Sequence, residues 1–515
     1  MKTKLTPFAK LLIVGGILAA VAFGSKALGL WDYFKEKQAE IQENEANGDS
    51  GRSDGDKVIK IGVVTWGGYA GGQYFNKSFK ANKESRFYKD YGFKVQFELL
   101  DDFDASRDAW RTGKIDLMWA TIDAFTTEVK QMEEYEPQVI FQSDWSRGGD
   151  AVVVRRGINS VSDLKGKKVA FAQMTPSHTF LLWLLDAGGL AYEDIQAVKV
   201  ANAIDAAKAF TSGSVDAAVV WSPDDADCVA KVAGSKVLQS TKGASHIIAD
   251  VFVAKKKYVE ANRKDLENLL RGWFKGAAEI NASDAARKEA ATILADGTGL
   301  DEGFFYDAIG NVRLCTYGDN LNFYGLNSDY SGVTAEQIYN KMEIKYKKAG
   351  AITEPIQNWR LVGNSSLLKA VSDLKTEKGQ EAEGQTGFTE VTDEIAHKEA
   401  ISTKQVSINF PSGKYNLDEN MKTIIDLQFL DIAKSFANAR IRIEGNTDDT
   451  GSREGNISIS KKRAQAVADY LITVHKFDKN RFIIVGNGPD KPVASNGTED
   501  GRSQNRRTEF KLVEN

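Results

Sequence analysis

The chain has 515 residues, of which 42% are hydrophobic and 27% are charged, and its formal net charge at pH 7 is −4. That length allows about three domains of ~150 residues each. The lack of a basic excess gives no indication of a nucleic-acid partner. The two cysteines, Cys228 and Cys315, form no CxxC motif and cannot supply a zinc ligand set. In an oxidising compartment they can form one disulfide, and otherwise they are two buried free thiols.

The N-terminus, residues 1–31, predicts export. Three lysines precede an apolar run over residues 11–24, and Lys26 interrupts its extension to Trp31. Basic residues before such a run place the N-terminus in the cytoplasm. The run has the length of a signal peptide, yet a helix over residues 8–31 would span ~36 Å, enough to cross a bilayer. We expect an uncleaved inner-membrane anchor with periplasmic domains; a cleaved signal peptide is the alternative.

Residues 32–57 are polar and charged, which predicts a spacer. From Val58 onward, strand-like runs such as VIKIGVVTW, KVQFELL and KVAFAQ alternate with helical patterns such as DASRDAWRTGKID and AIDAAKAFTSG. Strands and helices that alternate in this way predict parallel α/β layers. Helical patterns then dominate residues 258–310. We expect one α/β domain over residues 58–360.

Four predicted strands end in glycine, serine, threonine or aspartate residues that open a helix, at residues 66–72, 121–125, 174–182 and 222–226. Taken singly, such residues are usually turn glycines and helix N-caps. Ligands of open α/β sheets bind at the carboxyl ends of strands, and helix N-termini there suit an anion. The four turns together therefore predict a ligand cleft. His178 has no evident catalytic partner, and the sequence shows no catalytic, phosphate-binding or metal-binding motif, so we expect no enzyme, cofactor or metal.

Residues 148–226, with DLKGKKVA, a Thr-Pro-Ser turn and GSVDAAVVW, resemble periplasmic solute-binding proteins of the nitrate/sulfonate/taurine type. The resemblance extends over about residues 58–350 and implies the type II periplasmic-binding-protein fold, two α/β lobes around a cleft. It implies lobe crossings near residues 146–150 and 249–252, and an anionic solute delivered to a permease or a sensor. The implied solute-binding residues are Trp66, Gly67, Gly68, Tyr69, Thr121, Asp123, Thr175, Ser177, Trp221 and Asp224. Either Asp123 or Asp224 could equally pair with an amine.

A polar segment over residues 361–402 predicts a second linker. Residues 403–515 follow with a β-α-β-α-β-β pattern, which predicts a small α+β sandwich. Within this domain Asp448 ends a strand, and Arg463 lies on the next helix. The spacing of acidic residues does not fit a calcium loop. An exposed ion pair and a clamp for a zwitterionic ligand are both compatible with it.

The order NTDDTG, RAQAVADYL, GNG and NRR resembles the OmpA-like peptidoglycan-binding domain over about residues 405–513. The resemblance implies that Asp448 and Arg463 hold the diaminopimelate of a stem peptide. A carboxylate pairs with the ammonium of the ligand while a guanidinium grips its carboxylate. Further positions that match the motif are Asn446, Asn456, Asn505 and Arg507. Asn446 departs from the family, which has histidine there.

Together these features predict a non-enzymatic protein of the bacterial cell envelope. Its two-lobed domain would capture a small solute, and its C-terminal domain would bind peptidoglycan. The alternative is a structural protein that links the inner membrane to the cell wall and uses the solute-binding fold as a protein-interaction module.

Overall fold

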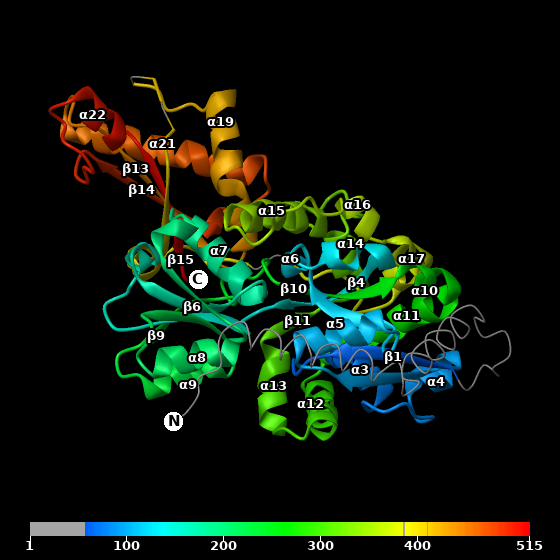
Figure 1. The fold of residues 1–515 in the computed structure, drawn as a ribbon. Helices are drawn as coiled ribbons and strands as arrows, with labels where there is room; N and C mark the ends of the chain where they lie inside the picture. The colour runs from blue at the N-terminus through cyan, green and yellow to red at the C-terminus, as the bar shows by residue number, and fades with distance from the viewer. Residues whose placement is uncertain (1–56, 385–386, 409, 412) are drawn as a thin grey trace, which may run out of the picture. The chain divides into compact units, whose positions relative to one another are not determined.

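The computed structural model describes residues 57–384, 387–408, 410–411 and 413–515 (Figure 1). The expected anchor and nearly all of the first spacer lie outside these residues. Within the described part of the chain, no helix combines the length and the apolar character needed to cross a membrane.

The first lobe is built on a six-stranded sheet in the order β11-β4-β10-β3-β1-β2 (Figure 1). Strands β1, β2 and β3 are parallel, whereas β10 is antiparallel to β3 and β4, and β11 is antiparallel to β4. Trp273 of the covering helix α11 packs its ring on Phe141 and Phe252, with ring centroids 5.1 and 4.9 Å away. The strands are β1 (Val58–Val63), β2 (Lys94–Leu99), β3 (Leu117–Thr121), β4 (Pro137–Ser146), β10 (Ala249–Lys255) and β11 (Val312–Leu314).

The helices of this lobe begin where the sequence supplies capping side chains. Asp102 accepts a hydrogen bond from the Ala105 amide at the start of α5, and Ser283 accepts one from Ala286 at the start of α12. Helices α12 and α13 lie side by side (Figure 1). The helices are α3 (Ala70–Asn76), α4 (Arg86–Tyr91), α5 (Phe103–Arg111), α6 (Ile122–Phe125), α10 (Lys256–Ala261), α11 (Arg263–Ala282), α12 (Asp284–Thr298), α13 (Glu302–Gly310), α14 (Tyr317–Phe323), α15 (Ala335–Lys348) and α16 (Trp359–Val362).

The second lobe is a five-stranded sheet in the order β7-β6-β8-β5-β9. Its strands β6, β7 and β8 are parallel, and β5 runs antiparallel to β8 and β9. A buried layer that includes Val153, Phe210 and Val220 joins this sheet to its helices. The elements are β5 (Asp150–Val154), β6 (Lys168–Ala172), α7 (Pro176–Ala187), β7 (Gln196–Val200), α8 (Ala203–Thr211), β8 (Ala217–Trp221), α9 (Asp224–Lys231) and β9 (Lys236–Ser240).

The chain crosses between the lobes twice within residues 137–255. It passes from β4 to β5 between Ser146 and Asp150, where the sequence predicts a crossing. It returns from β9 to β10 between Ser240 and Ala249, so the second crossing precedes the expected residues 249–252, which lie inside β10. Cys228 in the second lobe and Cys315 near β11 are both buried free thiols, in agreement with one of the two alternatives for the cysteines.

The predicted linker over residues 361–402 is largely folded, contrary to expectation. Helix α17 (Ser366–Ala370) and a 3-10 turn (Ser372–Thr376) bury Leu367, Leu368 and Leu374 in the core of the first lobe. A short helix, α18 (Asp393–His397), follows. Because these few leucines stand in a segment rich in polar residues, its composition hides its apolar face.

The C-terminal domain is a four-stranded sheet in the order β12-β15-β13-β14, in which only β13 and β14 are parallel. Its core stacks Phe429 on Phe510 with ring centroids 4.0 Å apart. The second strand-helix pair, β13 and α21, matches the prediction closely, whereas α22 was not predicted. The elements are β12 (Ala400–Val406), α19 (Glu419–Ile425), a π-helical turn (Asp426–Leu430), α20 (Asp431–Ser435), β13 (Arg440–Asn446), α21 (Arg453–Thr473), β14 (Phe482–Gly488), α22 (Glu499–Asn505) and β15 (Thr508–Val513).

Candidate solute cleft and peptidoglycan pocket

A small cavity lies between the two lobes, at the strand ends where the sequence predicts a ligand. Its volume is about 40 Å³, room for roughly three water molecules. Four predicted residues line it: Trp66, Tyr69, Thr121 and Trp221. The full lining is Val64, Thr65, Trp66, Tyr69, Trp119, Thr121, Asp150, Pro176, Trp221, Ile248 and Asp250. A wider cavity of about 390 Å³ shares Thr65 and Trp66 and is otherwise lined by residues of α13 and of the 222–226 turn, and by Arg287 and Asn311.

Trp66 is held in place by a carboxylate and two glycines. Its indole Nε1 donates a hydrogen bond to Oδ2 of Asp144 over 3.0 Å. A Cβ atom on Gly68 would lie 1.3 Å from that same oxygen, and one on Gly149 would lie 1.9 Å from the indole ring. Glycine is therefore required at both positions for the indole and the carboxylate to meet. Glycine is needed at position 67 for a different reason, because a Cβ atom there would lie 2.5 Å from the backbone of Ala308 in α13.

Asp250 lies between Thr121 of β3 and Asp144 of β4, as their direct cross-strand partner. Its Oδ2 accepts a hydrogen bond from the Tyr69 hydroxyl over 2.5 Å. Burial and then the nearby Asp144 carboxylate raise the pKa of Asp250 well above its usual value. Burial also raises the pKa of Asp144 to about 7, against the hydrogen bond from Trp66. Two carboxylates directly opposite on neighbouring strands repel each other when both are charged.

Asp150 lines the cavity from the second lobe, at the start of β5, as Asp250 does from the first lobe. Its Oδ2 accepts a hydrogen bond from the Ser146 hydroxyl over 2.8 Å. Ser146 also shares a hydrogen bond of 2.8 Å with Thr241, so the network joins both lobe crossings. Burial raises the pKa of Asp150 to about 7. Asp150 and Trp221 are direct cross-strand partners, which aligns this acid with an aromatic wall of the cavity.

Asp123, Thr175 and Ser177 lie behind the cavity wall, around the start of α7, and all three are buried. Burial raises the pKa of Asp123 to about 7, opposed by the Thr179 hydroxyl in the first turn of α7. Thr175 donates its hydroxyl to the Ala172 carbonyl over 2.9 Å, and the Ser177 hydroxyl has no hydrogen-bond partner among the described residues. The positive end of α7 therefore already faces a carboxylate.

The electrostatics of the cleft do not support the expected anion. Asp123, Asp144, Asp150 and Asp250 are all buried, and within the described part of the chain none of them forms a salt bridge. Two nearby guanidinium groups are already paired, Arg107 with Glu128 over 2.7 Å and Arg147 with Glu383 over 2.5 Å. A third, Arg287 of the wider cavity, donates to the Tyr306 carbonyl over 2.9 Å. Asp224, the other predicted acid, is half-buried in the first turn of α9 and does not line either cavity.

His178 is part of the core. Its ring packs against Phe171, Tyr192 and Tyr346, with ring centroids 4.7 to 5.7 Å away. Burial lowers the pKa of His178 to about 4, so the ring is neutral at physiological pH. Its Nδ1 accepts a hydrogen bond from the Met174 amide over 3.3 Å. This environment explains the histidine as a packing residue.

The C-terminal domain has a separate pocket of about 250 Å³ beside β13. Arg463 reaches it from α21 and donates hydrogen bonds to the carbonyls of Lys414 (3.0 Å) and Pro411 (3.3 Å). Its guanidinium also stacks over Phe410 at 5.0 Å. The pocket is lined by Ile408, Phe410, Gly445, Asn446, Arg463, Ser503, Arg506, Arg507 and Thr508.

Asp448 is buried at the end of the same strand and is fixed from two sides. Its Oδ1 accepts the Thr450 amide over 3.0 Å, and its Oδ2 accepts Arg506 Nη1 over 2.7 Å. Burial raises the pKa of Asp448, but these hydrogen bonds outweigh it, so the pKa lies below its usual value. The carboxylate is therefore charged at neutral pH. The neighbouring Asp449 is exposed.

Arg506 is a residue of this pocket that the sequence analysis did not single out. It bridges Asp448 and Glu499, with N–O distances of 2.7 Å to each. The direct Asp448 partner in this structure is Arg506 and not Arg463. The tripeptide NRR contains the necessary signal, because Arg506 lies between two positions that match the motif, Asn505 and Arg507.

The other predicted positions support the pocket walls. Asn456 donates to the Thr450 carbonyl over 3.0 Å and so holds the turn that contains Asp448. Asn446 accepts a hydrogen bond from Asn487 over 3.0 Å. Asn505 binds the backbone of residues 493–494 with its side chain. Arg507 is neutralised by Glu509 over 2.5 Å.

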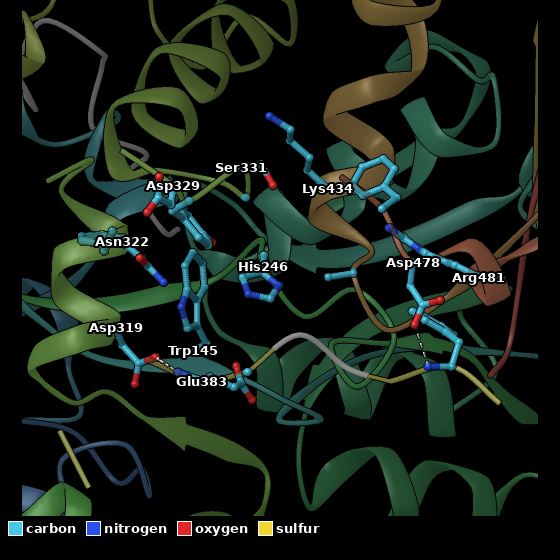
Figure 2. A pocket seen from close by; sticks show the side chains of 17 residues that line it. Trp145, His246, Asp319, Asn322, Asp329, Ser331, Glu383, Lys434, Asp478 and Arg481 are labelled. Carbon is cyan, nitrogen blue, oxygen red and sulfur yellow. Dashed lines mark hydrogen bonds between the residues drawn. The ribbon is translucent and has the colours of Figure 1, made fainter. Parts of the chain in front are cut away.

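A further cavity, of about 170 Å³, lies where the C-terminal domain contacts residues of the first lobe and of the crossing segment (Figure 2). Lys434, Asp478 and Arg481 approach it from the C-terminal domain, opposite Trp145 and His246. Arg481 donates to the carbonyls of Ala433, Phe436 and Ala439, and Asp478 accepts the Phe388 and Asn480 amides. Asp478 and Arg481 therefore already have partners within the protein and are not free to bind a ligand.

Comparison with known proteins agrees with this division of the chain. Residues 79–285 match the family described as NMT1/THI5 like, and residues 409–506 match the OmpA family. The chain joins an NMT1/THI5-like domain to an OmpA-family domain. Both resemblances seen in the sequence are thereby confirmed.

Relatives of each domain are known separately. The chain is 33% identical over 143 residues to a putative aliphatic sulfonates-binding protein of Escherichia coli, which covers 28% of this chain and 43% of that protein. It is 44% identical over 80 residues to the peptidoglycan-binding protein ArfA of Mycobacterium tuberculosis, which covers 16% of this chain and 24% of ArfA. The chain thus spans less than half the length of either relative.

Among solved structures, the NMT1/THI5-like domain is similar to the periplasmic aliphatic sulphonate binding protein SsuA of Escherichia coli. The TM-score is 0.47 and the sequence identity is 20%, over 59% of this chain and 97% of SsuA.

Proposed function

We propose that the protein is a cell-envelope binding protein with two binding sites. The NMT1/THI5-like domain captures a small solute between its lobes, and the OmpA-family domain holds the chain to peptidoglycan. The observation that carries this proposal is the coexistence of an interlobe cavity, walled by aromatic and polar side chains, with an arginine-lined pocket beside Asp448.

Solute capture would work by closure of the lobes around their two crossings. Tethering to the wall keeps the solute-binding domain at a high local concentration near an envelope partner, such as a permease or a sensor. The domains are of binding families, and His178 is a neutral packing residue, which supports binding without catalysis. The rival role, a structural link to the cell wall, requires no solute at all.

For the peptidoglycan pocket, Asp448 is placed to pair with the ammonium of a diaminopimelate side chain, and Arg463 with its carboxylate. The ammonium has to compete with Arg506 for Oδ2 of Asp448. Arg463 makes hydrogen bonds only to backbone carbonyls among the described residues, so its positive charge has no partner carboxylate at bonding distance.

Pull-down with diaminopimelate-containing peptidoglycan tests this half of the proposal. We expect Asp448→Ala and Arg463→Ala to abolish capture while the chain stays folded. Asp449→Ala is the matched control, because it removes an adjacent but exposed carboxylate and should leave capture unchanged. Undiminished capture by both pocket variants would refute the clamp.

Thermal unfolding with a broad panel of small metabolites tests the other half. A ligand at 100 times its Kd stabilises the folded state by about 2.7 kcal/mol. Saturable stabilisation by one compound supports solute capture, and its absence across the panel favours the structural role.

A further inference from the structure

We propose that the interlobe cavity takes a small organic cation, with an ammonium or guanidinium head held between Asp150 of one lobe and Asp250 of the other. This inference rests on the proposed solute capture and specifies the chemical class of the solute. It differs from the anion that the helix N-termini in the sequence suggest.

The first argument is that the carboxylates in the cavity have free acceptor atoms. In both Asp150 and Asp250, Oδ2 is engaged, by Ser146 and Tyr69 respectively. Among the described residues, neither Oδ1 has a hydrogen-bond partner, although both side chains are at least 94% buried, with 4% and 6% exposure. An unpaired buried carboxylate is costly, and an ammonium group donates up to three hydrogen bonds that would satisfy it.

The second argument is that aromatic side chains form the walls of the cavity. Trp66, Tyr69, Trp119 and Trp221 all line it, and Phe103 stacks behind Trp221 with ring centroids 6.2 Å apart. The faces of such rings attract cations, most strongly where water is excluded. The same rings offer no donor set for a sulfonate or a nitrate beyond their indole N–H groups.

The third argument is the overall charge around the cavity. Asp150 and Asp250 line it, and Asp144 is the cross-strand partner of Asp250, while Arg107 and Arg147 are committed to Glu128 and Glu383. Arg287 lines only the wider cavity, where it donates to the Tyr306 carbonyl. Among the helix starts that could favour an anion, that of α7 already has the Asp123 carboxylate near its first turn. A cation therefore lowers the electrostatic energy of the site, whereas an anion raises it.

This arrangement also supplies a mechanism for lobe closure. Without a ligand, lobe closure brings the Asp150 and Asp250 carboxyl groups together in a site where burial disfavours their charged forms. A cation between them stabilises both charged forms through two attractive interactions, so binding favours the closed form. The size of the inner cavity, about 40 Å³, suits a compact head group, and the wider cavity beyond Trp66 has room for the remainder of the solute.

The experiment measures thermal unfolding of the full chain at pH 7.5 with methylammonium, choline and agmatine, and in parallel with methanesulfonate and nitrate. We expect at least one cation to raise Tm saturably and the anions to have no effect. Asp150→Asn and Asp250→Asn should each weaken the binding of that cation at least tenfold. Asp90→Asn, which removes an exposed carboxylate on α4, should not.

A second measurement needs no variant. Calorimetric titration of the wild-type chain with the effective cation, in two buffers of different ionisation enthalpy at pH 7, should show net release of protons, because the cation favours the charged form of the aspartates. If only an anion stabilises the protein, the proposal of a cationic ligand is wrong, whereas the proposal of solute capture is supported. If neither cations nor anions stabilise the protein, both the cationic ligand and solute capture are refuted. Proton uptake on cation binding would show that the aspartates do not bind the cation.

Discussion

Replacing Asp150 by asparagine isolates the energetic cost of a buried acid in the cleft. Burial raises its pKa from 3.8 to about 7. Between these values the folded protein keeps a proton that the unfolded chain has released, so stability falls as the pH rises through this window. A difference of about 3 pH units corresponds to about 4 kcal/mol, at 1.36 kcal/mol for each. Asparagine cannot ionise and avoids this loss, and its amide oxygen can still accept the hydrogen bond from Ser146.

The assay is urea unfolding of the full chain at pH 5 and pH 8, followed by tryptophan fluorescence. At pH 8 we expect Asp150→Asn to be more stable than the native protein by up to about 4 kcal/mol. At pH 5 the difference should fall to about 1.6 kcal/mol, because pH 5 is only about 1.2 units above the unfolded pKa of 3.8 and the folded carboxyl is still protonated. Asp90→Asn should show no such pH dependence, since Asp90 is exposed. Equal differences at the two pH values, or a variant that is less stable at pH 8, would refute the assignment of Asp150 as a buried, destabilised acid.

Three further predictions concern the two sites. Arg506→Ala should tighten peptidoglycan capture by at most about fivefold, because the ion pair between half-exposed Arg506 and Asp448 contributes about 0–1 kcal/mol that the ligand no longer has to displace. A loss of capture as complete as that of Arg463→Ala would contradict this. Capture by the native chain should be as strong at pH 5 as at pH 7, as measured by pull-down, because the pKa of Asp448 lies below its usual value. Gly68→Ala should lower the free energy of unfolding by about 1–3 kcal/mol in urea, because its Cβ atom would clash with Asp144. Gly384→Ala is the control and should leave the stability unchanged, because a Cβ atom there would meet no atom within 4 Å.

Asp448 and Arg463 could be proposed for the peptidoglycan pocket from the sequence, because they are close together along the chain and belong to one short motif. The partner of Asp448 could not be found in this way. Arg506 comes from a distant segment, and only the folded sheet brings it to within 2.7 Å of the carboxylate.

The cleft was predicted only in part, for a related reason. Strand ends and aromatic residues at 66–69 and 221 were recognised, and they do line the cavity. Asp144 and Asp250 were not singled out, because cross-strand pairing between residues far apart along the chain cannot be read from one sequence. Their signal was present nonetheless. Each is a lone acid within an otherwise uncharged run, QSDWS and IIADVFVA, and a charge in a buried strand indicates a functional site.

Similarity to sulfonate-binding relatives does not decide which solute this cleft accepts. A shared backbone fixes where strand ends and helix N-termini lie, whereas the charge of the cavity depends on a few side chains that can change without altering the fold. In this chain those side chains are carboxylates. Trp66 and Tyr69, which hold two of the carboxylates, precede the segment that matches the NMT1/THI5-like family. The ligand class therefore has to be argued from Asp150 and Asp250 themselves, and their unpaired oxygens favour a cation.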